Sequence, residues 1–112
     1  MKAHQLENYR IVKEQVRPDT WCTAHVNCFR ASFGPGESDE HVGMKFKRWR
    51  YWRKKGFNVV VESILTNSLR PDLIVFSENE IFIEEIVYSE KKSSILKKKK
   101  EYPFKVFVFT ID

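Results

Sequence analysis

The chain is poor in the residues that build several common kinds of site. Its 112 residues include only two cysteines, Cys22 and Cys28, with His25 midway between them. A structural zinc site needs four ligands, and this segment offers at most three. If the segment is a strand, the two thiols share a face but lie too far apart to bond to each other. We expect two buried free thiols; a disulfide across a turn and a metal site are the alternatives.

Long apolar runs are also missing. No run approaches the roughly 20 residues that a membrane-spanning helix needs, and residues 1–8 lack the apolar segment of a signal peptide. We therefore expect an intracellular, cytoplasmic protein that does not bind a membrane. The sequence also lacks a glycine-rich phosphate loop, a dinucleotide motif and any Ser/His/Asp or Cys/His triad. These absences exclude the enzyme classes that depend on such motifs.

Apolar and aromatic residues are abundant. Hydrophobic residues make up 42% of the chain, with nine Phe, three Trp and four Tyr, so a packed core is expected. A chain of 112 residues has room for one such core. We expect a single domain in which residues 38–112 form the core and residues 1–37 pack on it as an N-terminal extension.

Positive charge exceeds negative charge and is clustered. Twenty Lys and Arg against fifteen Asp and Glu give a formal net charge of +5. One basic run lies within residues 45–55 and another within residues 91–100. Such runs suit a phosphate backbone, although a solvated helix face is the commoner explanation of a charge run alone. Because two runs flank the acidic strands described below, we expect a nucleic-acid partner.

The clearest local signal is a helix that begins after the break at residues 33–36. Ser38 is a typical N-cap, and Gly56 follows a cationic last turn. The helix carries one apolar stripe made of Val42, Phe46, Trp49 and Trp52. We expect Trp49 and Trp52 to pack in the core rather than stack on bases, whereas Tyr51 is free to face outward.

The remaining elements follow from hydrophobic periodicity. A short helix is expected over residues 4–16 and a weak strand over residues 20–29. Later strands are predicted over residues 57–64, 71–76, 81–88 and 104–111, with a helix over residues 93–102. The second and third of these strands form an antiparallel hairpin around a turn at residues 77–80.

Three acids stand within or beside these apolar strands. Asp72 opens one strand, and Glu84 and Glu85 lie inside the next. A carboxylate among Ile, Phe and Val is costly to bury unless a positive charge meets it. Acids on adjacent antiparallel strands can converge on a hard cation such as Mg²⁺, which prefers oxygen ligands. The pattern predicts a metal site of the kind that cleaves phosphodiesters.

Pro71-Asp72 at the start of one strand and Glu84-Glu85 within the next, in this order of elements, resemble the PD-(D/E)xK nuclease superfamily over residues 38–111. The resemblance implies an α/β fold with a restriction-endonuclease-like core: a helix, a three-stranded meander, a helix and a strand, with helices on a mixed sheet. It implies metal-dependent hydrolysis of nucleic acid, with DNA as the expected substrate and Mg²⁺ (or Mn²⁺) as the cofactor. It also implies a homodimer where both strands are cut.

In that family, Asp72 and one of the two glutamates would hold the metal, which activates a water and stabilises charge on the phosphate. If residues 77–80 form a symmetric turn, Asp72 lies directly opposite Glu85. If the loop has three residues, the register shifts and Asp72 faces Glu84. We favour Glu85 as the second ligand.

The resemblance assigns further roles. An acid on the first helix would assist, and here Glu40 or Glu37 matches, with His41 beside them. Glu62, at the end of an apolar strand, would be an additional ligand. The backbone contacts to nucleic acid would come from Lys45, Arg48, Arg70 and Lys92.

One residue of the family pattern is missing. Two places after the second acid, where the family usually has a lysine, this chain has Ile86 or Val87. Lys97 or Lys91 from the following segment would have to reach back. Lys97 is the better candidate, because a helix packed on the sheet points inward more reliably than a loop.

The missing lysine keeps two other classes of function open. One is a protein of the same fold that binds nucleic acid without cleaving it, through salt-sensitive contacts that need neither metal nor Asp72. The other is an interaction or regulatory protein whose basic runs meet an acidic partner.

Overall fold

The computed structural model describes residues 2–21, 25–30, 37–88, 95 and 99–111. These residues form two α-helices and one four-stranded mixed sheet, which confirms the α/β fold class. The elements are α1 Glu7–Gln15, α2 Asp39–Lys54, β1 Asn58–Val61, β2 Leu73–Phe76, β3 Ile81–Tyr88 and β4 Lys105–Ile111. Short 3₁₀ turns cover Ala3–Gln5, Pro18–Thr20 and Lys99–Glu101.

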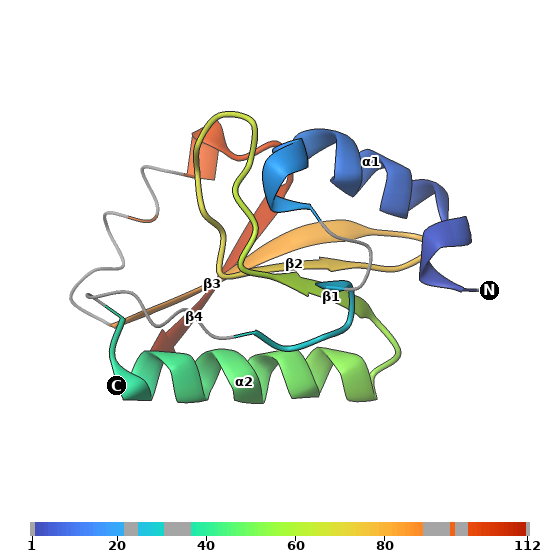
Figure 1. Cartoon of the computed structure of the whole chain (residues 1–112). Helices are drawn as coiled ribbons and strands as arrows, with labels where there is room; N and C mark the ends of the chain where they lie inside the picture. The colour runs from blue at the N-terminus through green and yellow to red at the C-terminus, as the bar shows by residue number, and fades with distance from the viewer. Residues whose placement is uncertain (1, 22–24, 31–36, 89–94, 96–98, 112) are drawn as a thin grey trace.

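The sheet has the order β1-β2-β3-β4, in which β1, β2 and β3 form an antiparallel meander and β4 runs parallel to β3. Figure 1 shows α1 against one face of the sheet and α2 along the other. Coverage on both sides explains why β2 is buried at every position. The result is three layers, with the sheet in the middle.

Each face of the sheet carries its own apolar core. The core under α1 joins the helix to the sheet through buried residues that include Tyr9, Val12, Ile74, Phe76 and Ile83. The core under α2 contains Val59, Val61, Leu73, Val75 and Phe82, with Trp49 and Trp52 packed against it. Alternate residues of β2 thus belong to opposite cores, as the two-residue period of a strand requires.

Helix α2 begins and ends where the sequence predicts. The Ser38 hydroxyl accepts a hydrogen bond from the His41 amide at 3.1 Å, which satisfies one donor of the first turn. Gly56 has a φ of 91°, the left-handed conformation that glycine adopts most easily after a helix. Tyr51 is exposed, as expected, while Trp49 and Trp52 pack on the sheet.

The hairpin has the symmetric register. Phe76 pairs with Ile81, and the Ser77 amide donates to the Glu80 carbonyl at 2.9 Å across the turn. Continuing the register by one residue beyond Leu73–Glu84 places Asp72 opposite Glu85. This is the pairing on which the preference for Glu85 rested.

The expected strand over residues 20–29 is wrong for the residues that the structure describes, which form turns and irregular backbone. Asn27 shows the reason: in a left-handed conformation (φ 65°), its amide donates to the Val59 carbonyl and its side chain accepts from the Val59 amide. It thereby caps the exposed edge of β1 without forming a ladder. Cys28 is a free but exposed thiol, so the prediction of burial is wrong there; Cys22 lies outside the described residues.

Strand β1 is shorter than predicted. It ends at Val61 because Glu62 has a φ of 57°, which turns the chain out of the sheet. The predicted helix over residues 93–102 falls mostly outside the described residues, and its end, Lys99–Glu101, is a 3₁₀ turn. No helix in the described part of the chain is both long and apolar enough to cross a membrane.

Candidate metal and nucleic-acid site

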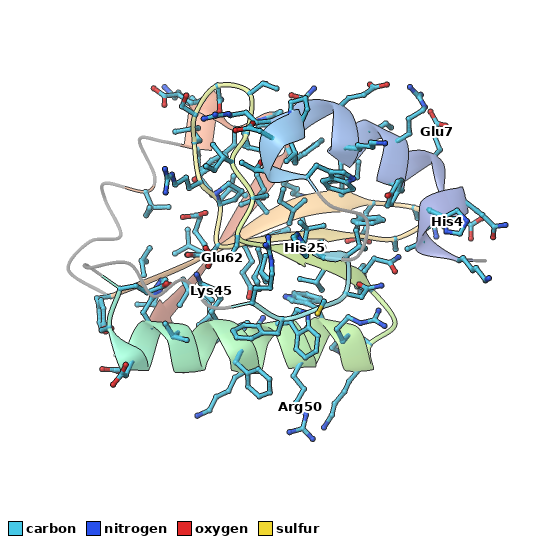
Figure 2. All side chains as sticks on the ribbon, in the orientation of Figure 1. His4, Glu7, His25, Lys45, Arg50 and Glu62 are labelled. Atoms are coloured by element: carbon cyan, nitrogen blue, oxygen red, sulfur yellow. The ribbon has the colours of Figure 1, made fainter. Side chains whose placement is uncertain are left out.

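The candidate site lies where the start of α2 meets one end of the sheet. Glu37, His41 and Lys45 are spaced four residues apart, so they line one face of the helix and its N-terminal approach. Glu62 follows β1 and Asp72 precedes β2, so both strands deliver an acid to the same end. Figure 2 shows Lys45 and Glu62 reaching toward each other between α2 and the sheet, whereas Arg50 extends from the opposite side of the helix.

Lys45 is the centre of this group. Its ammonium lies 2.6 Å from Glu37 Oε1, 2.8 Å from Glu62 Oε1 and 3.9 Å from Asp72 Oδ1, and the residue is only 5% exposed. Burial alone would lower the pKa of Lys45, but hydrogen bonds to Glu37 and Glu62 outweigh it and raise the pKa. The side chain therefore stays charged.

His41 is a second internal cation. Its Nδ1 lies 2.7 Å from Glu37 Oε1, and its Nε2 lies 2.8 Å from the Ile86 carbonyl and 3.6 Å from Asp72 Oδ2. A carbonyl and a carboxylate only accept, so both ring nitrogens carry a proton in this arrangement. The Asp72 carboxylate, 3.6 Å from Nε2, favours the charged ring and, partly opposed by burial, raises the pKa of His41 to about 9. For Glu37, bonds to Lys45 and His41 outweigh burial and lower the pKa.

Asp72 and Glu85 are tied together through the backbone. Asp72 Oδ2 accepts from the Ile86 amide at 2.8 Å, while Glu85 Oε1 accepts from the Asp72 amide at 3.0 Å. The Tyr102 hydroxyl also donates to Glu85 Oε1 at 3.2 Å, and burial together with the Glu85 charge raises the pKa of that phenol. Glu85 thus fixes the position of Asp72 from the strand that lies beside it.

Three of these residues can hold a metal ion. One ligand atom each from Glu37, His41 and Asp72 lie within 4.8 Å of one another. Two carboxylates and one imidazole are a donor set that divalent metals accept. His41 has to lose a proton before its ring nitrogen can act as a ligand, because a protonated nitrogen has no free lone pair.

A small open cavity of about 240 Å³ adjoins the group. The charged side chains in its wall are those of Glu37, Lys45, Glu62, Arg70 and Asp72. Arg70 is exposed at this cavity. The site therefore presents cations and acids together at the surface, where a phosphate group can meet them.

Glu84 lies elsewhere. Its carboxylate accepts two bonds from the Arg48 guanidinium, at 2.7 and 2.9 Å, and one from Trp52 Nε1 at 3.1 Å, on the α2 face of β3. The hydrogen bond to Glu84 raises the pKa of Arg48. The structure thus brings Glu85, and not Glu84, next to Asp72.

Several residues expected at the site are placed differently or are not placed. Glu40 is exposed and lies outside the group of residues that can hold a metal, whereas Glu37 belongs to it. Glu85 and Glu62, both expected as ligands, are not members of that group either: Glu85 accepts from the Asp72 amide, and Glu62 pairs with Lys45. Lys45, expected to contact a nucleic-acid backbone, instead has its ammonium buried among acids on three segments. Lys91, Lys92 and Lys97 lie outside the described residues.

The spacing of Glu37, His41 and Lys45 was a usable signal for their convergence. His41 and Lys45 lie one turn apart on the same face of α2, and Glu37 precedes its N-cap. That face meets the end of the sheet where Asp72 lies. Sequence reasoning placed Lys45 within a basic run and missed that it faces inward.

Comparison of the chain with protein-family models, with curated proteins and with solved structures finds no match.

The raised pKa of His41 predicts that the unfolding free energy depends on pH. The imidazolium is stabilised only in the folded protein, so its contribution is complete below an unfolded pKa of about 6.5 and is lost as pH rises through the folded pKa of about 9. Because the ring is partly open to solvent, which screens its interactions, we expect the unfolding free energy to fall by about 1–2 kcal/mol over this window. Urea unfolding in EDTA at a series of pH values measures it. His41→Asn should flatten this slope; an unchanged slope would show that another group causes it.

Proposed function

We propose that the protein is a metal-dependent nuclease with a restriction-endonuclease-like core. The observation that carries this proposal is the convergence of Asp72, Glu37 and His41 with the buried ammonium of Lys45 beside an open cavity. The antiparallel meander β1-β2-β3, with β4 parallel to β3 and helices on both faces, is consistent with that core.

The donor set suits a metal that accepts nitrogen as well as oxygen. Mg²⁺ prefers oxygen ligands, whereas an imidazole beside two carboxylates favours a metal such as Mn²⁺. We therefore propose Mn²⁺ as the better cofactor, with Glu37, His41 and Asp72 as its ligands. A divalent metal bound there would polarise a phosphoryl oxygen and lower the pKa of a bound water.

Other residues of the chain would stabilise charge on the phosphate, contact the nucleic-acid backbone and position Asp72. Lys45 takes the role of the missing lysine, because its ammonium lies 3.9 Å from Asp72 Oδ1 and its side chain lines the cavity. From there it can offset negative charge that develops on a phosphate. Arg70, exposed in the same wall, can contact the nucleic-acid backbone. Glu85 positions Asp72 by accepting its amide.

The direct test is cleavage of supercoiled, single-stranded and four-way-junction DNA in Mn²⁺, in Mg²⁺ and in EDTA. Cutting is expected only with metal. Asp72→Asn should reduce the rate at least about 100-fold, since even groups outside a metal's ligands cost about 10- to 100-fold. Glu78→Gln, an exposed acid in the turn between β2 and β3, is the matched control and should cut at the normal rate.

One observation favours the second candidate, a nucleic-acid-binding protein without cleavage. Lys45 and the doubly protonated His41 already pair with the acids of the group and offset two of its three negative charges. If these two cations serve only to balance the acids, the protein will not cleave DNA. The unmodified protein and Asp72→Asn will then bind DNA equally and with the same salt dependence.

A further inference from the structure

Two exposed aromatic rings share one flank of the α2 layer, away from the metal group. Among the described residues, the large apolar side chains with the most exposure are Phe46 (41%), Tyr51 (41%) and Phe107 (46%). Phe46 packs with Phe29 and Trp49. Tyr51 and Phe107 belong to a different surface, where α2 meets β4.

Cations lie over the aromatic rings of this surface. The guanidinium carbon of Arg48 lies 4.3 Å from the Tyr51 ring centre and 4.4 Å from the Phe109 ring centre. Lys55 Nζ lies 5.0 Å from the Tyr51 ring centre, and Lys105 Nζ lies 5.2 Å from that of Phe107. We call this surface the β4 flank; it consists of Arg48, Tyr51, Lys55, Lys105, Phe107 and Phe109.

The rings of the flank are held in place from within. Tyr51 meets Trp52 edge to face with centres 4.9 Å apart, Trp52 meets Phe82 at 5.0 Å, and Phe82 meets Phe107 at 5.3 Å. Arg48 is fixed by the buried carboxylate of Glu84. Rings that are braced in this way lose little freedom when a ligand stacks on them.

We propose that the β4 flank binds single-stranded nucleic acid by stacking unpaired bases on Tyr51 and Phe107. Exposed rings interleaved with Lys and Arg match both parts of such a ligand, because bases stack on the rings and phosphates meet the cations. Bases of a duplex are already stacked on one another and do not offer a free face. The charge of the flank thus complements a strand that carries one phosphate per base.

The β4 flank and the metal group both lie along α2. His41 lies near the start of α2 and Tyr51 ten residues further on, so about 15 Å of helix separates them. Under this proposal, a strand that follows α2 from the flank toward the start of the helix would meet the cavity that Lys45 and Asp72 line. The inference rests on the proposed function, and it deepens that function by naming single-stranded nucleic acid as the substrate class.

The test is fluorescence anisotropy with a labelled oligothymidine strand and with a duplex of equal length, both in EDTA, so that binding is measured without cutting. The single strand should bind more tightly than the duplex. Tyr51→Ala and Phe107→Ala should each weaken single-strand binding by about 5- to 100-fold. Tyr51→Phe keeps the ring and should bind as the unmodified protein does, which separates stacking from misfolding.

Phe46→Ala is the matched control, because Phe46 is as exposed as Tyr51 and lies on the same helix. An equal loss in Phe46→Ala, or a preference for the duplex, would overturn the proposal. So would sedimentation showing that Phe107→Ala turns a dimer into a monomer without changing DNA affinity, since the flank would then be a contact between two copies. This assay measures binding in EDTA and does not measure cleavage at the metal group. A loss of the proposed single-strand binding and a loss of the proposed nuclease activity are therefore distinct results.

Discussion

Replacing Lys45 with methionine should lower the unfolding free energy by about 3–5 kcal/mol, the range for removing one partner of a buried ion pair. Methionine is similar in length but carries no charge. It would leave the carboxylates of Glu37, Glu62 and Asp72 facing one another without the ammonium that now lies 2.6–3.9 Å from them. Urea unfolding followed by circular dichroism measures the change.

Lys47→Met is the control for this prediction. Lys47 is a lysine on the same helix but is exposed, so its loss should change stability by less than about 0.5 kcal/mol. Adding Glu62→Gln to Lys45→Met should recover part of the loss, because one of the repelling charges disappears. Equal stability of Lys45→Met and Lys47→Met would contradict the central position of Lys45.

Replacing Arg48 with methionine should lower the unfolding free energy by about 3 kcal/mol, the low end of the range for removing one partner of a buried ion pair. The Glu84 carboxylate is buried, with 4% side-chain exposure, and would lose two charged hydrogen bonds. It would keep the bond from Trp52 Nε1, which limits the loss. The measurement is again urea unfolding.

A double variant, Arg48→Met with Glu84→Gln, gives the control. The glutamine oxygen still accepts from Trp52 but brings no buried charge, so the double variant should be more stable than Arg48→Met alone. If the double variant is instead the less stable of the two, the cost does not come from an uncompensated charge.

The sequence was sufficient where local chemistry decides the outcome. Ser38 and Gly56 mark the ends of α2, and the four-residue turn after Phe76 sets the register that puts Asp72 opposite Glu85. Apolar periodicity also places Trp49 and Trp52 against the sheet. Each of these features depends on a few neighbouring residues, so the sequence pattern carries it.

The site depended on tertiary contacts that the sequence pattern does not encode. Lys45 stands in a run of seven basic residues, and only the packing of α2 on the sheet shows that it faces inward. Glu84 and Glu85 are adjacent in sequence but lie on opposite faces of β3, one bound to Arg48 and the other to Tyr102. Likewise, Glu62 and Asn27 adopt left-handed conformations that end β1 and cap its edge, which propensity does not predict.

Calorimetric titration of Mn²⁺ into the protein tests the central claim most directly, because it measures the metal site without assuming a substrate. We predict one ion per chain, no detectable binding by Asp72→Asn, and normal binding by Glu84→Gln, since Glu84 lies outside the group of Glu37, His41 and Asp72. Absence of binding by the unmodified protein, or equal binding by Asp72→Asn, would contradict the account.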